Sequence, residues 1–171
     1  EVKRLGIELM PPSINYSLIE FSAIINDAGN DAILFGLGAI KGSGSAAITR
    51  ILEARKEGNF KDMSDFMSRI DTSKVNKKVL EALIKSGSFD EFNLTRRSLL
   101  DHIEHIVEVG SKCARLKKDA AGSLFGAGKE MTTVEVNIEH LEEFEPRRIL
   151  ELEKETMGFY ISGHPLDSFR E

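Results

Sequence analysis

The sequence predicts a mainly α-helical chain. Apolar side chains recur at helical spacing, at positions i, i+3, i+4 and i+7, in several separate stretches. Serine, asparagine and glycine residues fall between these stretches, where helices begin and end. Hydrophobic residues make up 41% of the 171 residues and charged residues 30%, which is enough to bury a core and argues against intrinsic disorder.

Cysteine content and hydropathy exclude several classes of protein. Cys113 is the single cysteine, so an internal disulfide and a cysteine-based zinc site are both excluded, and we expect a buried or half-buried thiol. No run approaches the roughly 18 apolar residues of a membrane span, and no charged start followed by an apolar stretch predicts a secretory signal. We therefore expect a cytoplasmic protein with no membrane partner.

The charge is unevenly distributed along the chain. The whole sequence has 23 basic and 28 acidic residues, a balance that normally argues against a nucleic-acid binder. Residues 31–100, however, hold twelve basic and nine acidic side chains, whereas residues 130–171 hold four and eleven. The middle of the chain can therefore present a local anion-binding surface.

The elements are expected in the following order. Prolines, asparagines and a glycine in residues 1–30 predict a loop-rich piece with short extended parts, and the apolar run 33–40 is too short for a full helix. A first helix is expected after Ser45, which can cap it, and it should end before Gly58. A second helix is expected around residues 62–70, because its apolar side chains repeat with helical period.

Three more elements follow. Residues 76–86 predict a third helix, and Asn93 is expected to cap a long fourth helix that continues toward Leu116. Residues 119–144 lose the period and read as a linker. A last helix is expected from Pro146, a favoured first-turn residue, to about Met157.

The segment Lys41-Gly42-Ser43-Gly44 precedes the first helix. Its glycines can take positive φ, so consecutive backbone N–H groups can point outward at the start of the helix and bind an anion, usually a phosphate. The surrounding apolar-Gly-x-Gly-x-Ala-Ala pattern is typical of a helix-hairpin-helix motif, which grips the DNA backbone. We expect Gly42, Ser43 and Gly44 to donate to one phosphate, with Lys41 and Arg50 adding charge. The alternative is a purely structural glycine turn.

Two other glycine motifs are excluded. A nucleotide-binding P-loop requires Gly-Lys followed by Ser or Thr, whereas here Lys41 precedes Gly42. A dinucleotide-binding fold requires a strand after the helix, whereas another helix is predicted after Arg55.

A second turn, KSGSFD at residues 85–90, also lies between two predicted helices. Two hairpins in a pseudo-twofold pair can hold both strands of a duplex. The predicted contacts to the second strand are Lys85, Ser86, Gly87, Ser88, Arg96 and Arg97. The alternative, equally good from this segment alone, is a helix that ends at Gly87 and is followed by a buried Phe89.

Three segments together resemble a known family. They are LGAIKGSG at 37–44, LEALIKSGSFD at 80–90 and GFYISGHPL at 158–166, with Pro11, Pro12, Asn15 and Asn76 at matching places. In this order they are similar to the alpha subunit of bacterial DNA polymerase III, the C-family replicative polymerase. The match covers nearly the whole chain.

The resemblance implies a domain organisation. Residues 1–30 would end the fingers region, 31–118 would form a tandem helix-hairpin-helix domain on duplex DNA, 119–144 would be a linker, and 145–171 would form a helix leading toward an OB-fold. The whole protein would be a DNA-directed DNA polymerase, a nucleotidyltransferase. The aspartates that hold magnesium in this family would lie outside this piece, so no catalytic residue and no cofactor are expected here.

The resemblance also implies partners in DNA replication: double-stranded DNA, the sliding clamp and other replisome subunits. The family carries a clamp-docking peptide with the pattern Gln, two variable residues, Leu or Met, then Phe. Here Leu124 and Phe125 supply the apolar anchors, and Ala121 replaces the glutamine. The alternative is that Leu124 and Phe125 fold back onto the chain's own helices.

Two other functional interpretations stay open. One is a structural connector that braces fingers and OB-fold without touching DNA. The other is an enzyme site, which is disfavoured because the sequence shows no catalytic constellation. His102 and His105, at i and i+3, resemble one edge of a metal site, but no third ligand is nearby, so surface histidines are expected.

Overall fold

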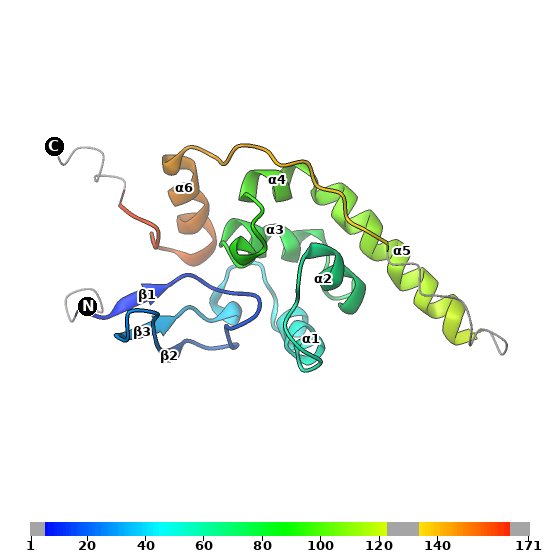
Figure 1. The fold of residues 1–171 in the computed structure, drawn as a ribbon, viewed down its shortest axis with the longest axis horizontal. Coiled ribbons are helices and arrows are strands. Elements are labelled where there is room, and N and C mark those ends of the chain that lie inside the picture. Colours follow the sequence, from blue (N-terminus) through cyan, green and yellow to red (C-terminus); the bar gives the residue numbers. More distant parts are fainter. Residues whose placement is uncertain (1–5, 123–133, 165–171) are drawn as a thin grey trace.

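The computed structural model describes residues 6–122 and 134–164. Its helices are α1 (Ser45–Arg55), α2 (Met63–Arg69), α3 (Lys77–Lys85), α4 (Arg96–Asp101), α5 (Ile103–Gly122) and α6 (Pro146–Met157), with two 3₁₀ turns, η2 (Leu37–Ala39) and η3 (Asp90–Phe92). Three short strands, β1 (Glu8–Met10), β2 (Ser22–Ile25) and β3 (Asp31–Leu34), complete the described elements. The mainly α fold class is confirmed (Figure 1).

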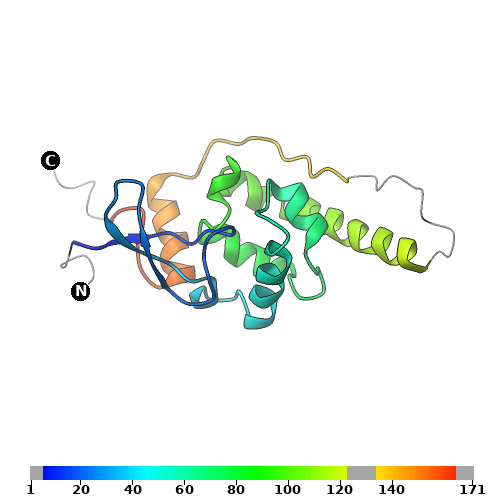
Figure 2. The ribbon, with the colours of Figure 1, turned by 60° about the horizontal axis from the view of Figure 1, so that its bottom comes forward.

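The strands form one small sheet in the order β1-β3-β2. β1 runs parallel to β3, with Leu9 opposite Ile33, and β2 runs antiparallel to it, with Ala23 opposite the same residue. The sheet lies at one end of the molecule, next to α6, while α5 extends at the other end (Figure 2). The apolar run 33–40 is divided between the end of β3, a short connection and η2, so it does not form a single element.

Two glycines around η2 are needed for close contact. The N–H groups of Leu37 and Gly38 donate to the carbonyl oxygens of Leu18 and Ile19, at 2.8 and 2.9 Å. A Cβ atom on Gly36 would lie 2.4 Å from the carbonyl carbon of residue 20, although its φ of −77° suits any residue. Glycine is therefore required here by backbone contact, and this contact fixes the N-terminal piece against the first hairpin.

The helix ends follow local capping rules in most places. Asp62 accepts a hydrogen bond from the N–H of Asp65 and so caps α2, and Asn76 accepts from Val79 and caps α3. Both helices therefore begin next to the residue where the sequence places their start. α6 begins at Pro146 and ends before a left-handed glycine, which agrees with the prediction.

Two predicted caps are wrong. Ser45 is already the first residue of α1, because Gly44, with φ of +69°, occupies the cap position. Asn93 takes a left-handed conformation, φ +56°, at the end of η3, and Thr95 caps the next helix by accepting from the N–H of Ser98. Asparagine tolerates this conformation well, which explains why it stops one element here and does not start another.

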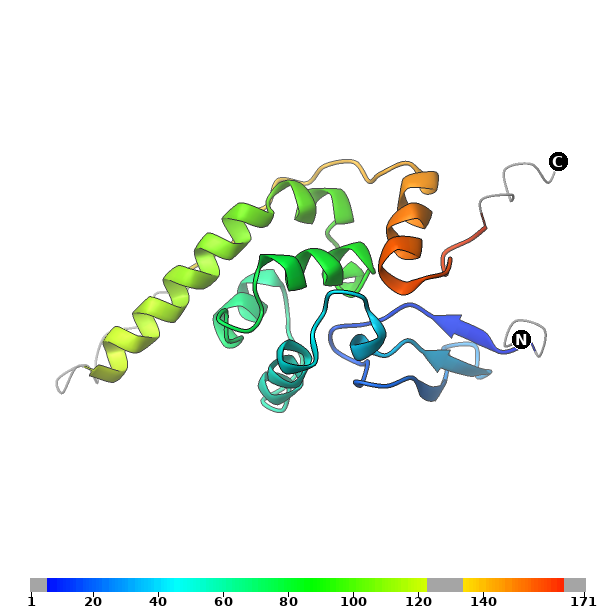
Figure 3. The ribbon, with the colours of Figure 1, turned by 180° about the vertical axis from the view of Figure 1, so that it is seen from behind.

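The predicted long fourth helix is two helices. The regular α-helical backbone breaks at His102, where φ is −102° and ψ is 12°, and separates α4 from α5. α5 then runs to Gly122, past the expected end near Leu116 and into the predicted linker. The described remainder of that linker, residues 134–144, is bound to the body: the N–H of Val136 donates to Ser64 Oγ at 2.9 Å. Figure 3 shows α5 projecting away from the other helices.

The hydrophobic core lies beneath both glycine turns. Phe66 of α2 and Phe89, which follows α3, are fully buried with ring centroids 5.0 Å apart in edge-to-face geometry. Phe60 and Phe92 extend this cluster on either side. Ile40, which precedes the first turn, belongs to the same cluster of buried side chains as Phe89, so the two turns share one core.

None of the described helices is both long and apolar enough to cross a membrane.

Candidate nucleic-acid interface

The first glycine turn exposes unpaired backbone donors. Gly42 and Gly44 have φ of +89° and +69°, and within the described residues neither N–H has a hydrogen-bond acceptor. No side chain caps α1, so the N–H groups of its first residues, Ser45 and Ala46, also lack an intrahelical acceptor. These donors and the positive end of the helix dipole together favour an anion at this place.

Ser43 does not belong to this set of donors. Its N–H donates to the carbonyl oxygen of Ile40 at 3.2 Å, and its hydroxyl donates to the carbonyl oxygens of Ile40 and Leu37, at 2.7 and 3.0 Å. The side chain is only 1% exposed. This geometry does not favour Ser43 as a phosphate donor, because its N–H and hydroxyl tie the turn to η2.

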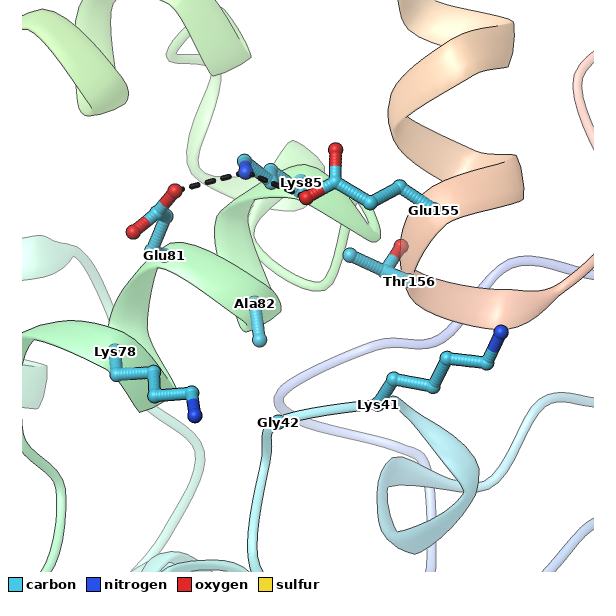
Figure 4. Close-up of a pocket in the computed structure, with 8 residues that line it drawn as sticks. All are labelled: Lys41, Gly42, Lys78, Glu81, Ala82, Lys85, Glu155 and Thr156. Atoms are coloured by element: carbon cyan, nitrogen blue, oxygen red, sulfur yellow. Dashed lines mark hydrogen bonds and ion pairs between the residues drawn. The ribbon is translucent and has the colours of Figure 1, made fainter.

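An open pocket of about 320 Å³ lies between the first turn, α3 and the end of α6 (Figure 4). The N–H of Lys41 donates to the carbonyl oxygen of Thr156, in α6, at 2.8 Å. A Cβ atom placed on Gly42 would lie 3.5 Å from the Cβ of Ala82, in α3. The first turn, α3 and α6 therefore meet closely. The residues that line the pocket are Lys41, Gly42, Lys78, Glu81, Ala82, Lys85, Glu155 and Thr156.

The three lysines of this pocket differ in their pairing. Lys85 binds Glu81 and Glu155 at 2.8 and 2.9 Å. Burial alone lowers the pKa of the Lys85 ammonium, but the hydrogen bonds and charges of these two carboxylates outweigh it and raise the pKa above its ordinary value. Lys41 and Lys78 are exposed and form no ion pair with any described residue. Their charges are therefore available to an anionic ligand, whereas that of Lys85 is already neutralised.

Lys78 is a residue that the sequence interpretation missed. It lies in the first turn of α3, and Ala82 and Lys85 follow at i+4 and i+7, so the three share the helix face that meets the first turn. This spacing, with a small residue between two lysines, is the signal in the sequence that could have identified it.

In the second glycine turn the N–H groups of Gly87 and Ser88 are already used within the chain. The N–H of Ser88 donates to the carbonyl oxygen of Leu83 and that of Gly87 to Ile84, both at 3.0 Å. This pair of bonds is the Schellman motif that ends a helix at a left-handed glycine. Ser86 and Ser88 are fully buried, and their hydroxyl groups bind each other at 2.8 Å. The geometry therefore favours the alternative interpretation of this turn, a helix C-cap followed by a buried phenylalanine.

Arg96 lies inside the protein. It is 4% exposed, pairs with Asp90 at 2.8 Å and reaches Glu153, itself fully buried, at 3.5 Å. Burial alone lowers the pKa of the guanidinium, but Asp90, Glu153 and Glu143 raise it above its ordinary value. The guanidinium also packs against Gly87, where an added Cβ would lie 2.3 Å from Nη2. The expectation that Arg96 reaches a phosphate is not supported, because its charge is compensated within the chain.

The start of α4 is occupied by a carboxylate of the same chain. Glu143 accepts from the N–H groups of Arg96 and Arg97 at 2.8 and 3.1 Å, in the place where an external anion would bind. The side chain of Arg97 is exposed, and Arg50 is exposed but pairs with Glu53 at 2.8 Å.

The remaining candidates give no site. His102 Nδ1 lies 2.9 Å from the carbonyl oxygen of Ser98, and Cys113 is buried. Within residues 6–122 and 134–164 no three His, Cys, Asp or Glu side chains are grouped as a metal site would require. Leu124 and Phe125 lie outside the described residues.

The sequence profile of the helix-hairpin-helix motif family matches residues 6–99, which include both glycine turns. The chain belongs to this family. The family name agrees with the pattern found around the first turn, although the helix before that turn is reduced to the single 3₁₀ turn η2.

Several curated proteins are similar to the chain over its whole length. DNA polymerase III subunit alpha of Campylobacter jejuni is 50% identical over 172 residues, and that of Helicobacter pylori (strain 26695) is 42% identical over 179. The subunit of Escherichia coli (strain K12) is 34% identical over 171 residues, which cover 99% of this chain. The helix-hairpin-helix chain spans only 14–15% of the length of these relatives. The resemblance to the DNA polymerase III alpha subunit is thereby confirmed.

Proposed function

We propose that the chain is a duplex-DNA-binding segment of a DNA polymerase III alpha subunit and that its first glycine turn binds a backbone phosphate. One observation carries this: the acceptor-free N–H groups of Gly42, Gly44 and the start of α1 lie beside two unpaired lysines, Lys41 and Lys78. Backbone donors and lysines recognise phosphate but no particular base, so binding should be independent of DNA sequence.

The full-length protein would act as a DNA-directed DNA polymerase. This proposal rests on the name of the relatives, of which the chain matches a small part. The chain's contribution would be to hold the duplex, together with the other subunits of the replisome, in the cytoplasm. Magnesium, which phosphoryl transfer requires, is not assigned to any described residue of this chain.

Neutralising the two unpaired lysines tests the DNA contact. We expect Lys41→Gln/Lys78→Gln to weaken binding of the 171-residue chain to a mixed-sequence duplex roughly tenfold or more near 0.1 M salt, and to reduce the slope of log K against log salt by about 1 to 2. Fluorescence anisotropy over a series of salt concentrations measures both quantities. The matched control is Lys56→Gln/Lys61→Gln, which removes two exposed charges beyond the far end of α1.

A second function, the structural connector, is favoured by a separate observation. The N-terminal piece is hydrogen-bonded to two parts of the helical body. Asn15 exchanges two hydrogen bonds with the backbone of Phe60, between α1 and α2, at 2.7 and 2.9 Å, and the N–H of Ile14 donates to the carbonyl oxygen of Ser88, in the second glycine turn, at 2.8 Å. A chain that only braces its neighbours would show no salt-dependent DNA binding, and Lys41→Gln/Lys78→Gln would then match its control.

The tethering of the sliding clamp is also proposed, on sequence alone. Leu124 and Phe125 would fill an apolar pocket on the clamp, and the missing glutamine at Ala121 would weaken the contact through lost amide hydrogen bonds. We expect Leu124→Ala/Phe125→Ala to abolish clamp binding and to leave DNA affinity unchanged, as measured by surface plasmon resonance. Ala121→Gln should tighten clamp binding, and no gain from it would argue for a hydrophobic contact within the chain.

A further inference from the structure

Helix α5 consists of two parts with different surroundings. Up to Cys113 its inner face is buried: Ile106 is fully covered, and the helix packs against α2 and α3. From Arg115 to Ala120 every side chain is exposed, including that of Leu116. Figures 1 and 3 show this second part projecting beyond the helices around it. Because a helix without apolar packing is only marginally stable in water, an end of this kind suits a bound partner.

The helix is strongly basic where the buried part passes into the projecting part. Residues 112–118, KCARLKK, contain four basic side chains and no acidic one, between Glu108 on one side and Asp119 on the other. We call residues 112–118 the basic arm. Lys112, Arg115 and Lys118 are exposed and form no ion pair with any described residue. The fourth, Lys117, points back to the body and donates to the carbonyl oxygen of Ser68.

The helix dipole does not account for this charge. It favours cations only in the last turn of a helix, and α5 ends at Gly122, so Lys112 and Arg115 lie well before that turn. Within one helix, like charges at i and i+3 repel each other, so Lys112, Arg115 and Lys118 are mutually unfavourable unless anions lie nearby.

We propose that the basic arm is a second contact to the phosphate backbone of duplex DNA. In Figures 1 and 2, which view the chain from different directions, α5 slopes toward the side of the molecule where α1 lies, and one duplex would then contact both the first glycine turn and the arm. The proposal rests on the DNA-binding function proposed above and extends it to a helix that the hairpin motif does not include. Lysine and arginine on a helix surface give no base readout, so the arm adds affinity without sequence preference.

Neutralising the arm tests the proposal. We expect Lys112→Gln/Arg115→Gln/Lys118→Gln to weaken binding of the 171-residue chain to a mixed-sequence duplex roughly ten- to hundredfold near 0.1 M salt, and to reduce the slope of log K against log salt by about 2 to 3. The charge-conserving variant Lys112→Arg/Arg115→Lys/Lys118→Arg should bind like the unmodified chain. Circular dichroism of both variants verifies that α5 is intact.

A matched control lies on another helix. Arg147→Gln/Arg148→Gln removes two exposed charges from α6, where both arginines already pair with Glu151, and should leave DNA affinity nearly unchanged. If the arm variant keeps the DNA affinity and the salt slope of the unmodified chain, the arm is not a DNA contact. If the unmodified chain itself binds DNA without salt dependence, the proposed function fails first. The two failures are therefore distinguishable.

Discussion

Replacing Arg96 by methionine should lower the free energy of unfolding by about 3–5 kcal/mol. The change leaves the carboxylate of Glu153 fully buried without its cation. The remaining bonds to this carboxylate come from the N–H groups of Ile161 and Ser162, at 2.8 and 3.0 Å, and from the Ser162 hydroxyl, and none of them carries a positive charge. Methionine keeps most of the volume, so the loss reports the charge and its hydrogen bonds. Urea denaturation measures it.

Arg97→Met is the matched control, since this neighbour has the same charge but an exposed side chain. Its effect should stay within about 0.5 kcal/mol. Removing the orphaned charge as well, in Arg96→Met/Glu153→Gln, should recover part of the stability lost in the single variant. Equal effects of Arg96→Met and Arg97→Met would contradict the buried ion pair.

Replacing Phe89 by alanine should cost about 3–5 kcal/mol of unfolding free energy. Its ring is fully buried and lies 5.0 Å from that of Phe66 and 5.6 Å from that of Phe92, centroid to centroid. Deletion therefore opens a cavity between α2 and the second glycine turn, which the surrounding helices cannot fill without moving. Thermal and urea unfolding measure the loss.

Phe159→Ala gives the comparison for Phe89. This ring is 37% exposed and contacts Phe35 at 5.5 Å, so its removal leaves a smaller cavity that water can reach. We expect it to cost less than half as much as Phe89→Ala. If Phe89→Ala were as mild as Phe159→Ala while its DNA affinity fell, the second turn would be a binding element and not a core element.

Both predictions concern the second glycine turn, and together they separate it from the first. The sequence makes the two turns look like copies, yet Gly87 serves a helix C-cap beneath the Arg96 guanidinium, whereas Gly44 opens the start of α1 toward solvent. An anion can therefore approach the backbone at the first turn. At the second it would meet buried serines and a carboxylate-paired arginine.

The sequence by itself determined the features that depend on near neighbours in the chain. Asn76 and Pro146 predicted where α3 and α6 begin, and the apolar stripes predicted the buried faces of α2 and α3, because caps and helical periodicity involve residues only a few positions apart. The first glycine turn, with Lys41 beside it, was likewise predicted from a few adjacent residues.

The tertiary structure alone decided the features that depend on distant contacts. The strands β1, β2 and β3 are too short to carry a clear pattern and form because the chain brings them together. Burial of Arg96 depends on Glu153, 57 positions away, and the anion position at α4 is filled by Glu143. A basic side chain looks the same in a sequence whether it faces solvent or an internal carboxylate. Only the fold distinguishes Lys41 and Lys78, which are exposed and unpaired among the described residues, from Lys85 and Arg96, whose charges are paired with carboxylates of the same chain.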